Sequence, residues 1–357
     1  MTAFDDLLTW RESSTSGEAI AAALEVAGRA SATELRILAD ADRVVVTGAG
    51  SSYYLAQAVA AAAREVLRRP VSAAPLSELI LRPDGVLVAG HAGGPAAVRE
   101  PVMIISRSGS TSEAVSVAER MRASGHPTIA VTCRGGSPLA VLADMTLVSP
   151  AGDEAAIVMT RSFASMLALL LGVVASVGAD GRLTADLDRI PGCLDQAVTA
   201  AGVGRRLGAT DWSRIVILGG GSASGIAAEW GLKLTETSQV QASAYEPLEF
   251  RHGPISVCEP GMLVVGLVGG AGAAEDVAVI EESAHLGAET WVIARDADEA
   301  AGATGQLSLI GGGLHPLARL PLLVHPAHGL ALALAQTRGC DPDAPRHLGQ
   351  VVILDPE

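Results

Sequence analysis

The fold is decided by a strand and the turn after it, Arg43-Val-Val-Val-Thr47 and Gly48-Ala-Gly-Ser-Ser52. The first part is an apolar, β-branched run, the second is rich in glycine and serine, and a helical stretch follows over 54–68. Short continuous runs that alternate with helices are typical of a parallel sheet covered on both faces. Further runs of this type occur at 101–105, 127–132 and 145–148. The sequence therefore predicts an α/β domain.

The same pattern returns in the second half of the chain. The run Arg214-Ile-Val-Ile-Leu218 leads into Gly219-Gly-Gly-Ser222, whose outer glycines and serine align with those of the first turn. Runs at 262–268 and 289–294 mirror the next two strands of the first half. One self-similarity over this length indicates an internal duplication and hence two domains. The expected divisions are an N-terminal helical arm at 1–32, domains at 33–185 and 200–345, and a C-terminal tail at 346–357.

Composition excludes several classes of protein. Hydrophobic residues make up 49% of the chain and charged residues 18%, which is too apolar for a disordered protein. The formal net charge of −14 repels nucleic acid and anionic membranes, so neither is expected as a partner. The four cysteines are scattered singly, without the spacing of a metal site or a disulfide framework. We expect neither a metal nor a cofactor.

Two segments bear on the location of the protein. The N-terminus is acidic and lacks the pattern of a signal peptide. The uncharged segment 162–179 just reaches the length of a membrane span, but it stands alone and contains serines and a glycine. We expect a buried core or interface helix there, with a membrane span as the alternative, and a cytoplasmic protein.

The strand at 101–105 runs into a turn crowded with hydroxyl groups. In open α/β sheets ligands bind at the carboxyl ends of the strands, where free N–H groups of the following helix favour an anion. Hydroxyls add short donors, so the turn predicts a phosphate site; a polar helix start without a ligand is the alternative. We call residues 106–112 the hydroxyl-rich turn, and its hydroxyl side chains are Ser106, Ser108, Ser110, Thr111 and Ser112.

One further residue of this turn and two residues of the first glycine turn are also candidates. Arg107 has two open alternatives, pairing with the phosphate or pointing to solvent. Ser51 and Ser52, in the first glycine turn, are expected to contact the same sugar phosphate. A dinucleotide fingerprint is not supported at that turn, because Tyr53 stands where its third glycine is required.

A charged stretch in the second half carries the strongest sign of catalysis. On a helix, Glu229, Lys233 and Glu236 lie at i, i+4 and i+7 and share one face. Their neighbours are apolar, which favours a buried helix over a surface salt-bridge ladder, and Lys233 is the only lysine of the chain. A partly buried lysine offers a titratable amine, which arginine does not. Glu236 is thus a candidate general base between C1 and C2 of an open-chain sugar, with a structural ion pair as the alternative.

His252 precedes Gly253 and Pro254, which places its imidazole on an irregular loop. Histidine can pass a proton between the ring oxygen O5 and the C1 hydroxyl of a pyranose near neutral pH.

The run 229–254 resembles the isomerase part of glucosamine-6-phosphate synthase and its relatives that lack a glutaminase. Those relatives include fructosamine-6-phosphate deglycases and galactosamine- or tagatose-6-phosphate isomerase/deaminases. The segment 106–111 looks like the phosphate loop of this family, 160–163 like the start of the helix that closes its first domain, and 341–348 like its tail. The resemblance implies two tandem flavodoxin-like, three-layer (αβα) sugar-isomerase (SIS) domains with parallel sheets.

The resemblance also implies roles for single residues. Glu236 would carry the proton between C1 and C2, with Lys233 beside it, and His252 would open the ring from the partner subunit of a homodimer with shared active sites. The phosphate would be held by Ser52, Ser106, Arg107, Ser108 and Thr111. We also count Gln350, in the tail, among the candidate substrate-binding residues.

Two departures from the synthase bear on the reaction. The chain has no N-terminal glutaminase, and Gln350 stands where the synthase has a tail lysine that forms an imine with the ketose. An amide cannot do that chemistry. We therefore expect an aminosugar-6-phosphate deaminase/isomerase, by default converting glucosamine 6-phosphate to fructose 6-phosphate and ammonia. The alternatives are a fructosamine-6-phosphate deglycase and a sugar-phosphate-binding regulator without turnover.

Overall fold

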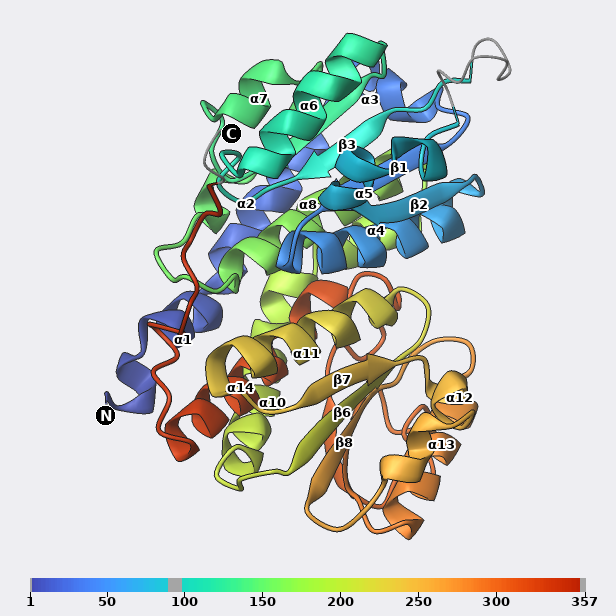
Figure 1. Ribbon diagram of the computed structural model, residues 1–357. Coiled ribbons are helices and arrows are strands. Elements are labelled where there is room, and N and C mark those ends of the chain that lie inside the picture. Colours follow the sequence, from blue (N-terminus) through green and yellow to red (C-terminus); the bar gives the residue numbers. More distant parts are fainter. Residues whose placement is uncertain (1, 89–97, 354–357) are drawn as a thin grey trace. The chain divides into compact units, whose positions relative to one another are not determined.

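The computed structural model of the chain describes residues 2–88 and 98–353 (Figure 1). It contains two parallel sheets of five strands each, and each sheet is the centre of one compact unit. The first-sheet unit comprises 18–154, 161–188 and the described residues from Gly349 on; the second-sheet unit comprises 2–17, 155–160 and 189–348.

The first sheet has the strand order β2-β1-β3-β4-β5, and all of its neighbouring strands are parallel. This is the flavodoxin-like order, in which the chain changes direction between the strands β1 and β3. Its strands are β1 (Val44–Gly48), β2 (Val71–Pro75), β3 (Val102–Ile105), β4 (Thr128–Thr132) and β5 (Met145–Val148).

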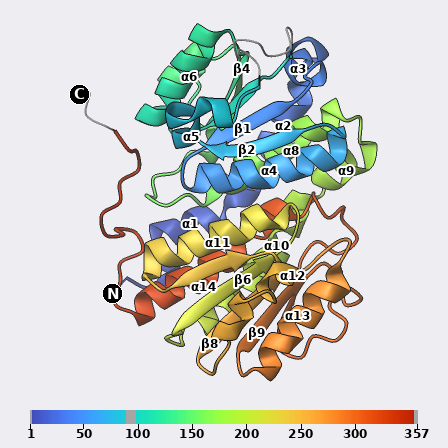
Figure 2. The ribbon, with the colours of Figure 1, turned by 45° about the vertical axis from the view of Figure 1, so that its right-hand side comes forward.

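Helices cover both faces of the first sheet (Figure 2). On one face Leu79, Val117 and Leu139 of three helices join Val45 and Ile104 of the strands in a buried cluster. The helices of this face are α5 (Leu76–Leu81), α6 (Ser112–Ser124) and α7 (Pro138–Leu142). The other face is covered by α4 (Ser51–Leu67), which packs on β1 and on α8 (Arg161–Val177). The unit is completed by α2 (Ser16–Arg29), α3 (Ala32–Ala39) and α9 (Gly181–Leu187).

The second sheet repeats this arrangement. Its order β7-β6-β8-β9-β10 is the same flavodoxin-like order, again with parallel neighbours. The expected fold of two tandem flavodoxin-like SIS domains is confirmed. The strands are β6 (Arg214–Gly219), β7 (Ala242–Tyr245), β8 (Met262–Leu267), β9 (Glu289–Ala294) and β10 (Gln306–Leu309).

Helices of the second-sheet unit divide between the two faces in the same way. Val264 and Val292 of the strands pack against Phe250 and Ile280 on one face, and the helices there are α12 (Pro247–Phe250) and α13 (Ala273–His285). The remaining helices are α1 (Leu8–Ser14), α10 (Leu194–Leu207), α11 (Ala223–Ser238) and α14 (His325–Thr337). Short 3₁₀ turns lie at 4–6, 83–85, 150–152, 190–193, 254–257 and 320–322.

The sequence analysis did not identify three strands, β2, β7 and β10, and all three are edge strands. Strand β7 is only partly buried along its whole length, and β2 is buried at Val71 and Ala74 alone. Such strands lack the continuous apolar run that marks a central strand. The expected domain limits stay predictions, but the compact units are not contiguous in sequence: α1 of the predicted arm packs on α14, whereas α2 belongs to the first-sheet unit.

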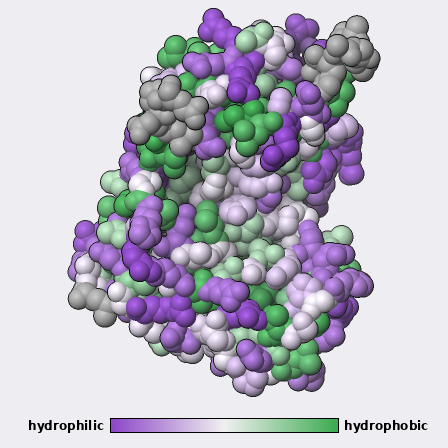
Figure 3. All heavy atoms as spheres, viewed as in Figure 1, coloured by the Kyte–Doolittle hydropathy of each residue, from purple (hydrophilic) through white to green (hydrophobic). Residues whose placement is uncertain are grey.

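The uncharged segment at 162–179 is a buried helix, as expected. It corresponds to α8, in which Phe163, Leu167 and Leu170 have no exposed surface. None of the helices within 2–88 and 98–353 is both long enough and apolar enough to span a membrane. On the face shown in Figure 3, purple hydrophilic residues alternate with smaller green areas, and the apolar side chains are concentrated in the two cores.

Candidate functional site

The first glycine turn joins β1 to α4 at the carboxyl edge of the first sheet. Gly50 has φ of 55° and precedes the helix, a conformation that favours glycine. A side chain at Gly48 would lie 2.5 Å from the carbonyl oxygen of Ser52, so this close approach also requires glycine. Ser51 and Ser52 are the first two residues of α4, at the helix start rather than in the turn, and both are buried.

The hydroxyl-rich turn lies at the neighbouring position, between β3 and α6. Its hydroxyls hold the turn itself: Ser106 Oγ accepts from Gly109 N at 3.2 Å and lies 3.4 Å from Thr111 Oγ1. Ser108 Oγ accepts from Ser110 N at 3.1 Å. The tight bend needs Gly109, which has φ of 62° and leaves no room for a side chain beside Ser137.

The start of α6 is left without a side-chain cap. Thr111 is the N-cap residue, and its side chain makes no capping hydrogen bond. The chain near the C-terminus approaches this helix start, because Ser112 N donates to Val352 O at 3.3 Å. Two adjacent helix starts, of α4 and α6, therefore stand at the switch point of the first sheet, where the positive ends of the helix dipoles favour an anion.

Arg107 does not point to solvent, so that alternative is wrong. Its side chain is buried, with Nη1 3.6 Å from Glu154 Oε1 and Nη2 donating to Gln350 O at 2.9 Å. The main chain of Arg107 is fixed as well, since its carbonyl accepts from Thr132 Oγ1 and from Cys133 N. The residue thus belongs to the turn by its backbone and to a buried ion pair by its side chain.

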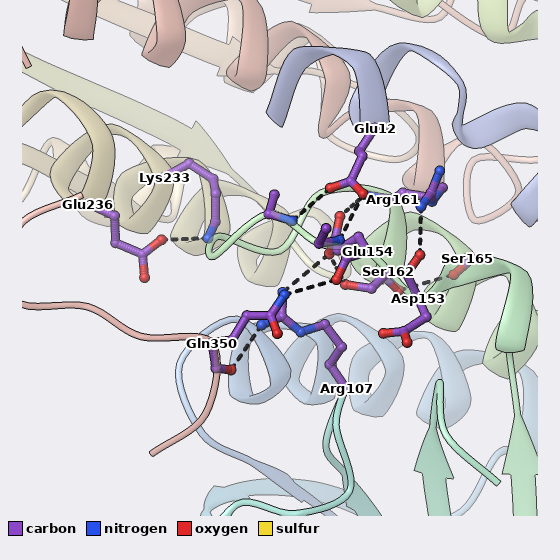
Figure 4. Close-up of polar contacts among 12 residues, drawn as sticks. Glu12, Arg107, Asp153, Glu154, Arg161, Ser162, Ser165, Lys233, Glu236 and Gln350 are labelled. Atoms are coloured by element: carbon purple, nitrogen blue, oxygen red, sulfur yellow. Dashed lines mark hydrogen bonds and ion pairs between the residues drawn. The ribbon is translucent and has the colours of Figure 1, made fainter. Parts of the chain in front are cut away.

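Glu154 organises this corner of the first-sheet unit and was not identified from the sequence. Its side chain is fully buried and accepts from Arg161 N at 3.0 Å and from Ser162 Oγ, both at the start of α8. Its carbonyl oxygen accepts from Gln350 Nε2 at 3.0 Å. Figure 4 shows Arg107, Gln350 and Ser162 arranged around Glu154. The signal in the sequence was a carboxylate that precedes the Thr160–Phe163 motif by a few residues.

The predicted charged face is on α11, in the second-sheet unit. Lys233 Nζ lies 2.5 Å from Glu236 Oε2 and 3.5 Å from Glu229 Oε1. The exposed fractions of the three side chains are 2% for Lys233, 1% for Glu229 and 20% for Glu236. The burial contradicts a surface salt-bridge ladder and confirms the buried helix. Glu236 is the most exposed of the three, and Figure 4 shows its carboxylate beside the amine of Lys233.

A pair of buried histidines on α14 lies near Lys233 and was also missed. Ser13 Oγ and His328 Nδ1 are 2.6 Å apart, and the ring of His325 packs edge-on against that of His328. The pKa of His328 is well below its ordinary value. The main cause is burial of the ring, and the charges of His325 and then of Lys233 lower it further. Burial likewise lowers the pKa of His325 to about 4. Both imidazoles are neutral at pH 7. No pattern in the sequence linked them to Lys233, because the two residues lie far from it along the chain.

His252 lies in the turn between α12 and the 3₁₀ turn at 254–257, as predicted, and its side chain is exposed. The next residue, Gly253, has φ of 131°. The candidate residues thus fall into two groups. The phosphate-site candidates and Gln350 are in the first-sheet unit, while Lys233, Glu236 and His252 are in the second-sheet unit.

Comparison with known proteins places the chain in a family. The model of the SIS domain matches residues 37–175 and 210–307, which is more than half of the chain. The protein belongs to the SIS domain family. Both matched segments of this SIS-domain protein coincide with the two parallel sheets.

The relatives that the chain matches carry the names of sugar-phosphate enzymes. It is 30% identical over 345 residues to a glutamine–fructose-6-phosphate aminotransferase of Aeropyrum pernix, a match that covers 89% of this chain and 52% of the relative. The chain thus spans about half the length of the curated relatives it matches. Among solved structures, the C-terminal domain of glucosamine-fructose-6-phosphate aminotransferase from Francisella tularensis superposes with a TM-score of 0.85 at 20% identity, covering 95% of this chain and 98% of that one.

A glucosamine-6-phosphate deaminase from Thermotoga maritima matches over nearly its whole length. The TM-score is 0.75 at 25% identity, and the match covers 97% of this chain and 99% of that chain. This SIS-domain protein is therefore related both to the isomerase part of the aminotransferase and to a deaminase of about its own extent.

Proposed function

We propose that this SIS-domain protein is a sugar-phosphate isomerase/deaminase that acts at C1–C2 of an aminosugar 6-phosphate. The default substrate is glucosamine 6-phosphate, and the products are fructose 6-phosphate and ammonia. The observation that carries the proposal is the buried lysine between two carboxylates, of which only Glu236 has access to solvent. A buried ion network with one accessible carboxylate is typical of a general base held in a fixed orientation.

The reaction consists of proton transfers and one hydrolysis. His252 passes the proton of the C1 hydroxyl to O5, which opens the ring. Glu236 then takes the proton from C2 and returns it to C1, while O1 gains a proton and the amine loses one. The resulting imine at C2 adds water and breaks to a ketone and ammonia. Lys233 keeps the Glu236 carboxylate in place throughout, at the observed 2.5 Å.

The phosphate would bind at the two helix starts of the first-sheet unit, with Ser51 and Ser52 on one side and the hydroxyl-rich turn on the other. The ester carries up to two negative charges, which backbone N–H groups and hydroxyls at a helix start stabilise. Gln350 is proposed to act here as a structural residue, because its amide donates to the carbonyl of Glu154. This supports a reaction that needs no imine with the protein.

The exposure of His252 supports a homodimer in which this residue completes the site of the partner subunit. The deglycase alternative uses the same groups, because the bond broken is again the one from the sugar carbon to nitrogen. It differs in the leaving amine, which would be an amino acid, and in the carbon that bears it: a fructosamine has its nitrogen on C1, so the proton would move from C1 to C2 and hydrolysis of the C1 imine would leave an aldose 6-phosphate.

The decisive experiment incubates the protein with hexosamine 6-phosphates, fructosamine 6-phosphate adducts and ketose 6-phosphates, and measures ammonia, free amino acid and ketose. Ammonia from a hexosamine 6-phosphate is the expected result. Glu236→Gln should lower kcat by about 10²- to 10⁴-fold with little change in the Kd of fructose 6-phosphate, because the amide cannot accept the proton. The exposed Glu289→Gln serves as the control. Binding of sugar phosphates without any turnover would show a regulator instead.

A further inference from the structure

Arg107 of the hydroxyl-rich turn forms an ion pair with the buried carboxylate of Glu154. The guanidinium is 6% exposed and the Glu154 side chain not at all. Arg107 Nη1 and Glu154 Oε1 lie 3.6 Å apart and form an ion pair. The carboxylate also accepts hydrogen bonds from Arg161 N and Ser162 Oγ.

A fixed negative charge at this place opposes the binding of an anion. Charges in a protein interior are weakly screened, so a buried carboxylate acts on a phosphate several ångströms away. The positive charge of Arg107 offsets this negative charge. Arg107 is held in the turn because its backbone carbonyl accepts hydrogen bonds from Thr132 Oγ1 and Cys133 N. The burial of Cys133, followed by the nearby charge of Glu154, raises the pKa of that thiol, and the charge of Arg107 opposes this shift.

We propose that Glu154 is a positioning residue that sets the anion affinity of the hydroxyl-rich turn, by holding the Arg107 side chain and balancing its charge. This inference rests on the proposed phosphate site, and it extends that proposal to a residue outside the turn. The pair keeps the affinity moderate, so that the phosphorylated product can leave.

The proposal predicts effects of opposite sign for the two partners. Glu154→Gln removes a negative charge and leaves Arg107 in excess, so the Kd of fructose 6-phosphate should fall by about tenfold. Arg107→Gln leaves the carboxylate uncompensated, so that Kd should rise by about tenfold. The double variant should return close to the wild-type value. The contact with Gln350 survives in Glu154→Gln, because it uses the main-chain carbonyl.

The measurement is isothermal titration of the full chain and its variants with fructose 6-phosphate and with inorganic phosphate, at low and at high salt. Asp153→Asn is the matched control, because this adjacent carboxylate is one third exposed and pairs with Arg134; its Kd should change less than twofold. Thermal unfolding confirms that each variant is folded. If wild type binds neither ligand, the proposed function fails. If wild type binds and Glu154→Gln weakens binding, or the double variant is no better than Arg107→Gln, the inference is wrong and the role of Glu154 is purely structural.

Discussion

The turns after β3 and β8 occupy equivalent positions in the two sheets, but their side chains differ in kind. After β3 the turn carries five hydroxyl side chains in seven residues, and α6 begins without a side-chain cap. After β8 the corresponding turn is Gly269-Gly-Ala-Gly272, with no hydroxyl. Here the protein fills the space itself: a side chain at Gly269 would meet Arg319 Nη1 at 2.4 Å, and Gly270 N donates to Glu299 Oε1 at 2.9 Å.

In the second-sheet unit, side chains of the protein itself fill the end of the central strand. Arg319 is buried and donates to Val268 O at 2.7 Å, which ties the end of β8 to the rest of the unit. Burial lowers the pKa of Arg319 to about 10, and the guanidinium remains charged at pH 7. Glu299 and Arg319 thus fill the end of the second sheet. The ionisable groups proposed for catalysis lie elsewhere in that unit, Lys233 and Glu236 on α11 and His252 after α12. On the proposed function, the first-sheet unit would bind the phosphate and the second-sheet unit would carry the proton-transfer groups.

The largest expected effect tests the second half of this comparison. Lys233→Met would leave Glu229 and Glu236 without the buried ammonium between them, and an unpaired buried carboxylate costs about 3–5 kcal/mol of folding free energy. The variant should also lose turnover, because Glu236 is no longer held in place. Urea unfolding and kcat measure the two effects. Lys233→Arg, which keeps the charge, should retain most of the stability, and equal stability of Lys233→Met and wild type would contradict the buried network.

A smaller effect concerns the neutral histidines of the second-sheet unit. The folded-state pKa of His325, about 4, lies below the ordinary value of 6.5, first because of burial. The unfolded chain therefore binds more protons between pH 6.5 and 4, and the free energy of unfolding falls as pH falls through that range. His325→Asn keeps a donor for the carbonyl of Leu322 and removes this dependence.

The free energy of unfolding of His325→Asn, relative to that of wild type, should rise by about 2–3 kcal/mol when the pH is lowered from 8 to 4.5. Unfolding by urea at a series of pH values measures it, and pH 8 is the internal control, since the imidazole is neutral there in both states. A difference that does not vary with pH would show that the imidazole titrates alike in the folded and unfolded chain.

The smallest effect tests the two turns directly. Ser106→Ala should raise the Kd of fructose 6-phosphate by about tenfold, which corresponds to one hydrogen bond to a charged group. Ala271→Ser, which adds a hydroxyl to the second turn, should create no second phosphate site, because Arg319 and Glu299 already fill that end of the sheet. Titration stoichiometry separates the outcomes: two phosphates per chain in Ala271→Ser would overturn the contrast between the turns.

The proposed site was predicted unevenly from the sequence. The α11 residues were found because 3.6-residue periodicity places 229, 233 and 236 on one face, and the single lysine drew attention to them. Burial of this helix was predicted from its apolar neighbours and is confirmed at Glu229 and Lys233, whereas Glu236 is partly exposed. Glu154 and His328 could not be found in this way, since their importance comes from partners at Arg107, Gln350 and Ser13, far away in the chain.

By itself, the sequence determined the layers. Apolar β-branched runs followed by glycine turns specify central parallel strands, and the duplication of that pattern specifies two domains, because each strand must bury both faces under helices. The partner of each buried polar group, in contrast, is known only from the tertiary structure. It turned Arg107 inward to Glu154, placed Ser13 against His328, and closed the second turn with Arg319. Buried polar groups need partners, and which partner is in reach depends on packing that a linear pattern does not contain.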